Sequence, residues 1–128
     1  MASTVSSSPS RKKKKPAERY PPPKENDFLG DVIKIAHLHG WTVSHFRSVH
    51  TPSGWRTPVQ ADGTGFPDLV LVRHERLIFA ELKVGYNKLT DAQTAWRLLL
   101  LGVASSSPNI QVEVWRPADW DRINSDLR

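Results

Sequence analysis

The apolar positions between residues 25 and 39 recur at helical spacing, and a glycine follows them. These positions are Phe28, Leu29, Val32, Ile35 and Ala36. Gly40 can supply the left-handed residue with which many helices end. Residues 41–46 then alternate, with Trp41 and Val43 set against polar neighbours. We therefore expect a helix over roughly 25–39, followed by a first strand over 41–46.

The segment 47–66 shows no period and contains Pro52, Gly54, Pro58, Gly63 and Gly65. We expect a long structureless loop here. Such loops are uncommon in compact domains and are usually functional or mobile.

Two apolar runs follow, Leu69–Val72 and Leu77–Ala80, around the polar residues 74–76. Continuous apolar strands indicate burial on both faces of a sheet covered by helices. Because the connection is short, we expect an antiparallel hairpin.

A second helix is predicted from Thr90, because Thr90 with Gln93 has the form of a capping box. Its apolar positions are Ala92, Ala95, Trp96, Leu99 and Leu100, and we expect it to stop at Gly102. Residues 110–115 alternate as a further strand, which a crossover connection would place parallel to the preceding one. Pro117 can open a short last helix, with Trp120 and Ile123 facing inward. The order of elements predicts an α/β fold.

The composition restricts the class of protein. A chain of 128 residues has the length of one domain. Cysteine is absent, which excludes disulfides and a cysteine nucleophile. No uninterrupted apolar stretch is longer than Leu98–Leu101, and a bilayer span takes about 20 such residues. No apolar segment follows the basic N-terminus, so we expect no secretory signal and no membrane partner.

The net charge of +5 is concentrated in residues 1–24. This tail holds seven basic side chains against one acidic, a net +6, whereas residues 25–128 hold eleven against twelve, a net −1. The tail is also rich in serine and proline, so we expect it to be disordered. Its basic run, Lys12, Lys13, Lys14 and Lys15, is typical of salt-sensitive attraction to nucleic acid, or of a solubilising tail.

Three charged residues stand at the ends of the two apolar runs. Along a strand Glu81 and Lys83 share a face, and the hairpin returns Asp68 towards them. A two-residue turn at 74–75 sets Asp68 opposite Glu81, and one at 75–76 sets it opposite Lys83. A three-residue turn would set Asp68 opposite Leu82 and separate the cluster.

Two carboxylates held together repel one another unless a cation joins them. Mg²⁺ takes oxygen ligands, so Asp68, Glu81 and the carbonyl of Leu82 form a candidate metal site. Such a metal polarises a phosphoryl oxygen and activates water, and Lys83 could orient that water. The alternative is a solvated ion pair worth about 0–1 kcal/mol. The position of Glu81 at the end of an apolar run favours the site.

At these residues the sequence resembles the VRR-NUC branch of the PD-(D/E)XK nuclease superfamily. The resemblance lies in Gly65–Arg73 and Ile78–Lys83, with further agreement at Gly40-Trp41, at Leu89-Thr90 with Gln93 and Trp96, and over residues 114–120. It covers roughly residues 25–123. It implies that 25–128 form a VRR-NUC-like nuclease domain with a restriction-endonuclease-like core, a four-stranded mixed β-sheet flanked by helices.

The resemblance also implies cleavage of DNA with Mg²⁺ or Mn²⁺ and without a small-molecule cofactor, in a bacterial or phage-infected cytoplasm, by a homodimer. Asp68 and Glu81 would ligate metal and Lys83 would serve the attacking water. Glu25 matches an acidic position of the family's first helix, or is a favourable charge at a helix N-terminus. Gln93 would line the site as well as cap its helix.

Arg47 and Arg56 in the long segment lie where DNA could pass, and arginine contacts to phosphate position a duplex. Trp55 nearby could stack on an unpaired base. The leading hypothesis is a metal-dependent DNA endonuclease, with selectivity for branched DNA such as a Holliday junction as a further expectation. The alternative is a catalytically silent DNA-binding module with a nuclease fold. A sequence-specific restriction enzyme is a minor third reading, since no base-reading side chains are evident.

Overall fold

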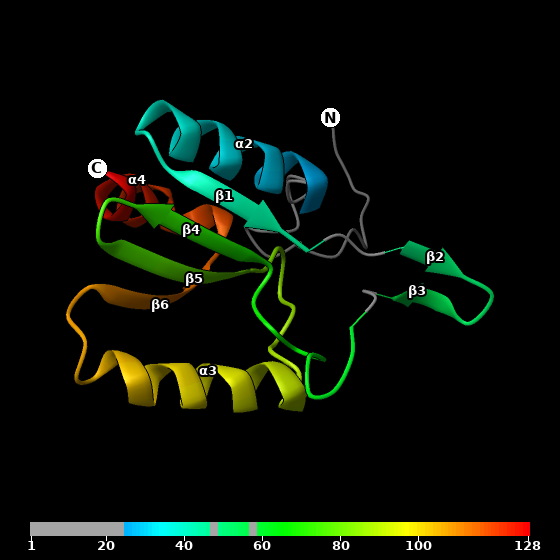
Figure 1. Ribbon diagram of the computed structural model, residues 1–128. Coiled ribbons are helices and arrows are strands. Elements are labelled where there is room, and N and C mark those ends of the chain that lie inside the picture. Colours follow the sequence, from blue (N-terminus) through cyan, green and yellow to red (C-terminus); the bar gives the residue numbers. More distant parts are fainter. Residues whose placement is uncertain (1–24, 47–48, 57–58) are drawn as a thin grey trace, which may run out of the picture.

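The computed structural model describes residues 25–46, 49–56 and 59–128, which form one sheet with helices on both sides and a separate hairpin (Figure 1). The elements are α2 (Glu25–Leu38), β1 (Thr42–His45), β2 (Val49–Thr51), β3 (Gly54–Arg56), β4 (Leu69–Arg73), β5 (Arg76–Leu82), α3 (Asp91–Ala104), β6 (Ile110–Trp115), a 3-10 turn η1 (Pro117–Asp119) and α4 (Trp120–Leu127).

The main sheet has four strands in the order β1-β4-β5-β6. The first two pairings are antiparallel, and β6 runs parallel to β5 after the crossover through α3. Helices α2 and α4 cover one face and α3 lies against the other (Figure 1). The expected α/β class, with a mixed four-stranded sheet flanked by helices, is confirmed. Within the described residues, no helix combines the length and apolar composition needed to cross a bilayer.

The core lies between the sheet and the pair α2 and α4. Phe28, Val32 and Ala36 recur every fourth residue, and all three are buried. They pack in one cluster with apolar residues of β4, β5 and α4. The helix ends at a Schellman motif, in which Gly40 has φ +83° and the amide of Trp41 donates to the carbonyl of Ala36 at 3.0 Å. The predicted first helix is therefore confirmed to within a residue.

The C-terminal residues close this core around Trp41. Its indole Nε1 donates to the carbonyl of Leu127 at 2.9 Å. The guanidinium groups of Arg73 and Arg76 lie 4.6 and 4.9 Å from the centre of the Trp41 ring. Both arginines also donate to the carbonyl of Arg128. The turn between β4 and β5 is thus tied to the last residues of the described chain.

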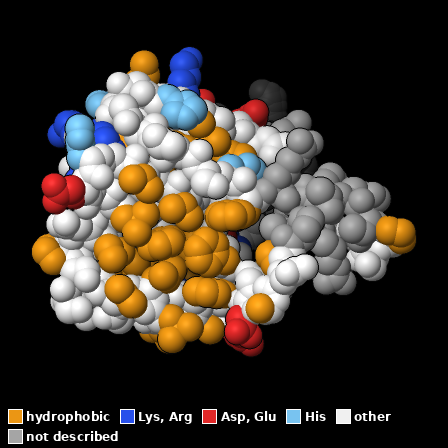
Figure 2. Space-filling model, in the orientation of Figure 1, with side chains coloured by type: hydrophobic (Ala, Val, Ile, Leu, Met, Phe, Trp, Pro, Cys, Tyr) orange, Lys and Arg blue, Asp and Glu red, His pale blue; other side chains and the backbone are white. Residues whose placement is uncertain are grey.

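The opposite face of the sheet is only partly covered. Phe66 makes edge-on contacts with the rings of Phe46, Phe79 and Trp96. Val72, on the same face of β4, is 44% exposed, so the expectation of burial on both faces holds only in part. Figure 2 shows apolar side chains gathered on the visible surface of this side of the molecule.

Helix α3 differs from its prediction at two points. It continues past Gly102 to Ala104, because a glycine without positive φ is tolerated inside a helix and the chain turns only at Ser105. Leu99, expected to face inward, is 66% exposed, and Leu98 beside it is 64% exposed. Ala95, also expected to face inward, is exposed, and the half-buried positions are Ala92, Gln93, Trp96, Arg97, Leu100, Leu101 and Ala104.

The expected structureless loop is wrong for residues 49–56. β2 and β3 pair antiparallel, with Val49 opposite Arg56 and Thr51 opposite Gly54 across a two-residue turn. This hairpin stands apart from the main sheet (Figure 1). Strands of three residues are too short to display a period, and the proline and glycine around their turn are equally typical of an irregular loop. The remaining predicted elements, β1, β4, β5, β6 and the last helix, all occur.

Candidate functional site

The turn between β4 and β5 sets the register of the candidate site. Arg73 pairs with Arg76, which leaves His74 and Glu75 as a two-residue turn, and His74 adopts φ +53°. The pairing ends with Leu69 opposite Ala80, so the next pair along the same register is Asp68 and Glu81. Of the registers left open by the sequence, the structure has the one that, extended by one pair, places Asp68 opposite Glu81.

Asp68 lies where β4 begins, and its side chain continues the ladder. Its Oδ2 accepts a hydrogen bond from the amide of Leu82 at 2.9 Å. Its own carbonyl accepts from the amide of Phe46 at 3.1 Å. In an antiparallel ladder the amide and the carbonyl of one residue point to the same neighbouring strand. The carbonyl of Leu82 therefore lies on the side of Asp68, as a shared ligand set requires.

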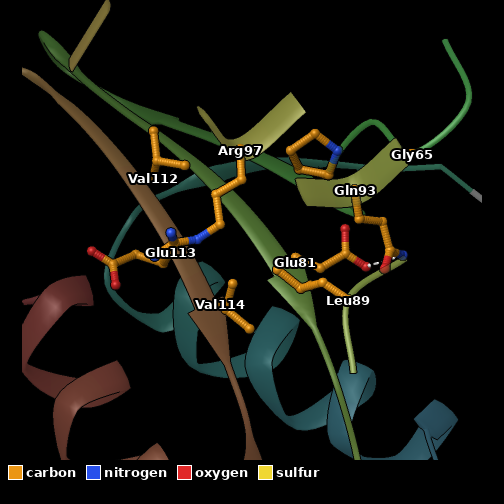
Figure 3. Close-up of a pocket in the computed structure, with 9 residues that line it drawn as sticks. Gly65, Glu81, Leu89, Gln93, Arg97, Val112, Glu113 and Val114 are labelled. Atoms are coloured by element: carbon orange, nitrogen blue, oxygen red, sulfur yellow. Dashed lines mark hydrogen bonds between the residues drawn. The ribbon is translucent and has the colours of Figure 1, made fainter. Parts of the chain in front are cut away.

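Glu81 is the single buried charged residue among those described, with 7% of its surface exposed. It belongs to the sheet face that α3 covers, opposite to the face of Ala80 and Leu82. Gln93 Nε2 donates to Glu81 Oε2 at 3.0 Å (Figure 3). A buried carboxylate needs such a partner, because desolvation is costly without hydrogen bonds.

Gln93 is held in place by the start of its own helix. Its Oε1 accepts from the amide of Thr90 at 2.9 Å, and its amide donates to Thr90 Oγ1 at 3.1 Å. The predicted capping box is therefore confirmed. The two readings of Gln93 are compatible, since one end of its carboxamide caps the helix and the other contacts Glu81.

A close approach of the chain to α3 positions the segment before Asp68. Gly65 has φ +85°, and a Cβ built on it would lie 2.5 Å from the carbonyl carbon of Ala92. Only glycine fits there. Trp96 Nε1 donates to the carbonyl of Asp62 at 2.8 Å, which fixes the same loop to the next turn of α3. The loop carrying Asp68 and the helix carrying Gln93 are thus in direct contact.

Lys83 follows the last residue of β5 and is half-buried. Its amide donates to the carbonyl of Trp115 at 3.0 Å, which continues the pairing with β6. Strand alternation puts its side chain on the face of Glu81. The structure thus brings Asp68, Glu81, Leu82, Lys83 and Gln93 to one end of the sheet.

Other predicted residues lie elsewhere or are not described. Glu25 opens α2 at the backbone level, but its side chain lies outside the described part of the structure, as does that of Arg56. Arg47 and the basic run Lys12–Lys15 lie outside the described residues altogether. His45, which was not assigned a role, is exposed on β1.

A hollow opens beside Glu81, between α3 and the sheet (Figure 3). It is shallow, with room for about one water molecule, and is partly open to solvent. Its described lining is Gly65, Pro67, Glu81, Leu89, Gln93, Arg97, Val112, Glu113 and Val114. Arg97 belongs to none of the motifs of the sequence analysis. Its spacing of one helical turn after Gln93 is the signal that would have placed it there.

The oxygen donors at this end of the sheet suit a hard divalent cation that takes only a few of its ligands from the protein. The described residues contain no group of three or more histidine, cysteine, aspartate or glutamate side chains suited to a metal. The two carboxylates and the Leu82 carbonyl are oxygen donors, and Mg²⁺ commonly completes a set of one or two carboxylates with water and substrate phosphate.

No protein-family model and no curated protein matches the sequence.

Proposed function

We propose that this chain is a metal-dependent DNA endonuclease with a restriction-endonuclease-like fold of the VRR-NUC type. The observation that carries the proposal is the register of the β4–β5 hairpin, which sets Asp68 and Glu81 opposite one another at the end of a sheet. A surface ion pair would not require Glu81 to be buried and hydrogen-bonded to Gln93. A buried carboxylate held by a hydrogen bond is typical of an active site.

In this proposal Asp68, Glu81 and the Leu82 carbonyl hold Mg²⁺ or Mn²⁺. The bound metal would polarise the phosphodiester and lower the pKa of a water. The side chains of this chain do the rest. Lys83 orients the attacking water and offsets negative charge that develops on the phosphoryl oxygens. Gln93 keeps Glu81 in one orientation through the hydrogen bond that joins them.

The test compares cleavage of branched, flapped and linear DNA in Mg²⁺ or Mn²⁺. Asp68→Asn keeps the shape of the side chain but removes its charge, and should lower the rate at least about 100-fold, because the metal contributes several kcal/mol. Glu75→Gln is the matched control, the same change at the exposed turn of the same hairpin. Equal rates for wild type and Asp68→Asn would reject the proposal. Tight DNA binding without any cleavage would favour the silent DNA-binding module instead.

We further propose that the protein acts as a homodimer. The feature that supports this is the outer side of α3, where Leu98, Leu99 and Val103 are all more than half exposed. These three side chains are uncharged, so two copies could bring them together without charge repulsion. A dimer would present two sites to two strands, as cleavage of a junction requires. A monomer in light scattering at micromolar concentration would count against it.

A further inference from the structure

One arginine beside the candidate site has a donor that no described residue satisfies. Arg97 is half-buried on α3, and its Nε is buried with no hydrogen-bond partner among the described residues. No ion pair within the described part of the chain includes it. Buried polar groups in native proteins are nearly always hydrogen-bonded, and an unpaired one is costly. The Nε–H of Arg97 therefore lacks an acceptor among the described residues, so a bound group could supply one.

The surroundings of Arg97 favour an anion as that acceptor. Figure 3 shows its side chain reaching from α3 towards β6, where it ends beside Val112, Glu113 and Val114. The side chains of Val112 and Val114 solvate a cation poorly, so a negative partner is favoured. Glu113 does not provide one, because its carboxylate pairs with Arg122. Glu81 also lines the hollow and accepts from Gln93, but no ion pair in the described part of the chain joins it to Arg97.

We propose that Arg97 is a phosphate-binding residue that holds a backbone phosphate of the DNA strand passing Glu81. The inference rests on the proposed function, since it takes the strand to lie at the hollow that Glu81 and Arg97 both line. The planar guanidinium matches the oxygens of a phosphate and forms paired hydrogen bonds with them. Residues 25–128 carry a net charge of −1, so a cation at this position offsets local repulsion of DNA.

Removal of Arg97 separates this role from a structural one. Arg97→Met keeps the long aliphatic stem and removes the unpaired donor. If Arg97 awaits a phosphate, the melting temperature of the DNA-free protein should stay equal or rise. If Arg97 instead supports the fold through an ordered water, the melting temperature should fall.

The experiment measures DNA binding by the full chain in Ca²⁺ over a series of salt concentrations. Arg97→Met should raise Kd about tenfold or more and reduce the slope of log K against log salt by about 0.9, the value for one lost phosphate contact. Arg97→Lys should restore the slope. The matched control is Lys34→Met, which removes the same charge from an exposed position of α2 on the other side of the sheet. It should leave Kd within about twofold, because this position is remote from the strand.

The outcomes distinguish this inference from the proposed function. Wild-type cleavage with an unchanged Kd and slope for Arg97→Met would overturn the phosphate contact alone. A reduced salt slope for Arg97→Met, together with no cleavage by wild type, would support the phosphate contact and reject the nuclease. Inorganic phosphate that raises the wild-type melting temperature, with no effect of Arg97→Met on DNA binding, would overturn DNA as the source of the phosphate. Failure of wild type to bind DNA would overturn both.

Discussion

Gln93 joins the start of α3 to the buried carboxylate of Glu81, with 3.0 Å between its Nε2 and Glu81 Oε2. The same carboxamide accepts from the amide of Thr90 through its oxygen. One side chain therefore serves helix capping and site geometry together. Substitutions that remove one of these bonds at a time can separate the two roles.

Gln93→Glu should impair the site more than the helix. The new carboxylate can still accept from the amide of Thr90, but it replaces the donor to Glu81 with a second negative charge. We expect cleavage to fall at least tenfold in a DNA cleavage assay. Thr90→Ala is the control, because it removes the cap oxygen and leaves the Glu81 contact. It should cost about 1 kcal/mol of stability in urea unfolding and little activity. A similar loss of activity in both variants would contradict the separation.

Three glycine substitutions test the contact between the loop and α3. Gly65→Ala should lower the free energy of unfolding by about 1–3 kcal/mol, because it combines positive φ with a 2.5 Å approach to Ala92. Gly85→Ala has positive φ in open space and should cost less. Gly30→Ala lies inside α2 with nothing nearby and should stabilise by up to about 1 kcal/mol. Denaturant unfolding gives all three values, and any other order would contradict the contact.

Trp41→Phe should destabilise the fold without touching the site. It removes the hydrogen bond to the Leu127 carbonyl and reduces the ring against which Arg73 and Arg76 lie. We expect a loss of about 1–3 kcal/mol in thermal or urea unfolding. Trp120→Phe, half-buried at the edge of the core, is the comparison and should cost less. An equal or larger loss for Trp120→Phe would argue against the role of Trp41.

Leu99→Glu tests the apolar side of α3 as a dimer surface. The side chain is 66% exposed, so monomer stability should change by no more than about 0.5 kcal/mol. Two like charges facing one another across a two-fold axis should dissociate a dimer, as light scattering would show. Leu38→Glu, equally apolar and 73% exposed on α2, is the control and should leave the assembly unchanged.

Removal of residues 1–23 tests the basic tail. This change removes six of the seven tail cations, so DNA binding should weaken and become less dependent on salt. Cleavage at saturating DNA should change less, because the tail supplies attraction and not chemistry. A truncated protein that binds DNA at low salt as well as the full chain would show that the tail only aids solubility.

The sequence predicted those parts of the fold that depend on local chemistry. The capping box of Thr90 and Gln93 requires only residues three apart, and the short connection at His74 restricted the register of Asp68 to a few choices. The inward side of α3 was not predictable in the same way. Residues 98–101 are all leucine, so no period marks which of them faces the sheet.

The position of Arg97 could not be predicted from the sequence either. A charged residue within an apolar helix is expected to face solvent, yet here it faces the sheet and leucines 98 and 99 face outward. That arrangement depends on contacts with β6, which lie more than ten residues away in sequence. The β2–β3 hairpin was missed for a different reason, since Thr51-Pro52-Ser53-Gly54 indicates a turn but the flanking strands are too short to show alternation.

The fully buried side chains of Ile123 and Leu127 share one core cluster with Phe28 and Val32 of α2. A chain emerging from the ribosome exposes α2 long before residue 127 has been synthesised. The apolar side of α2 therefore stays uncovered until α4 has been synthesised. The domain should acquire its native stability only after synthesis has passed residue 127. Until then the growing chain exposes apolar side chains, to which chaperones bind.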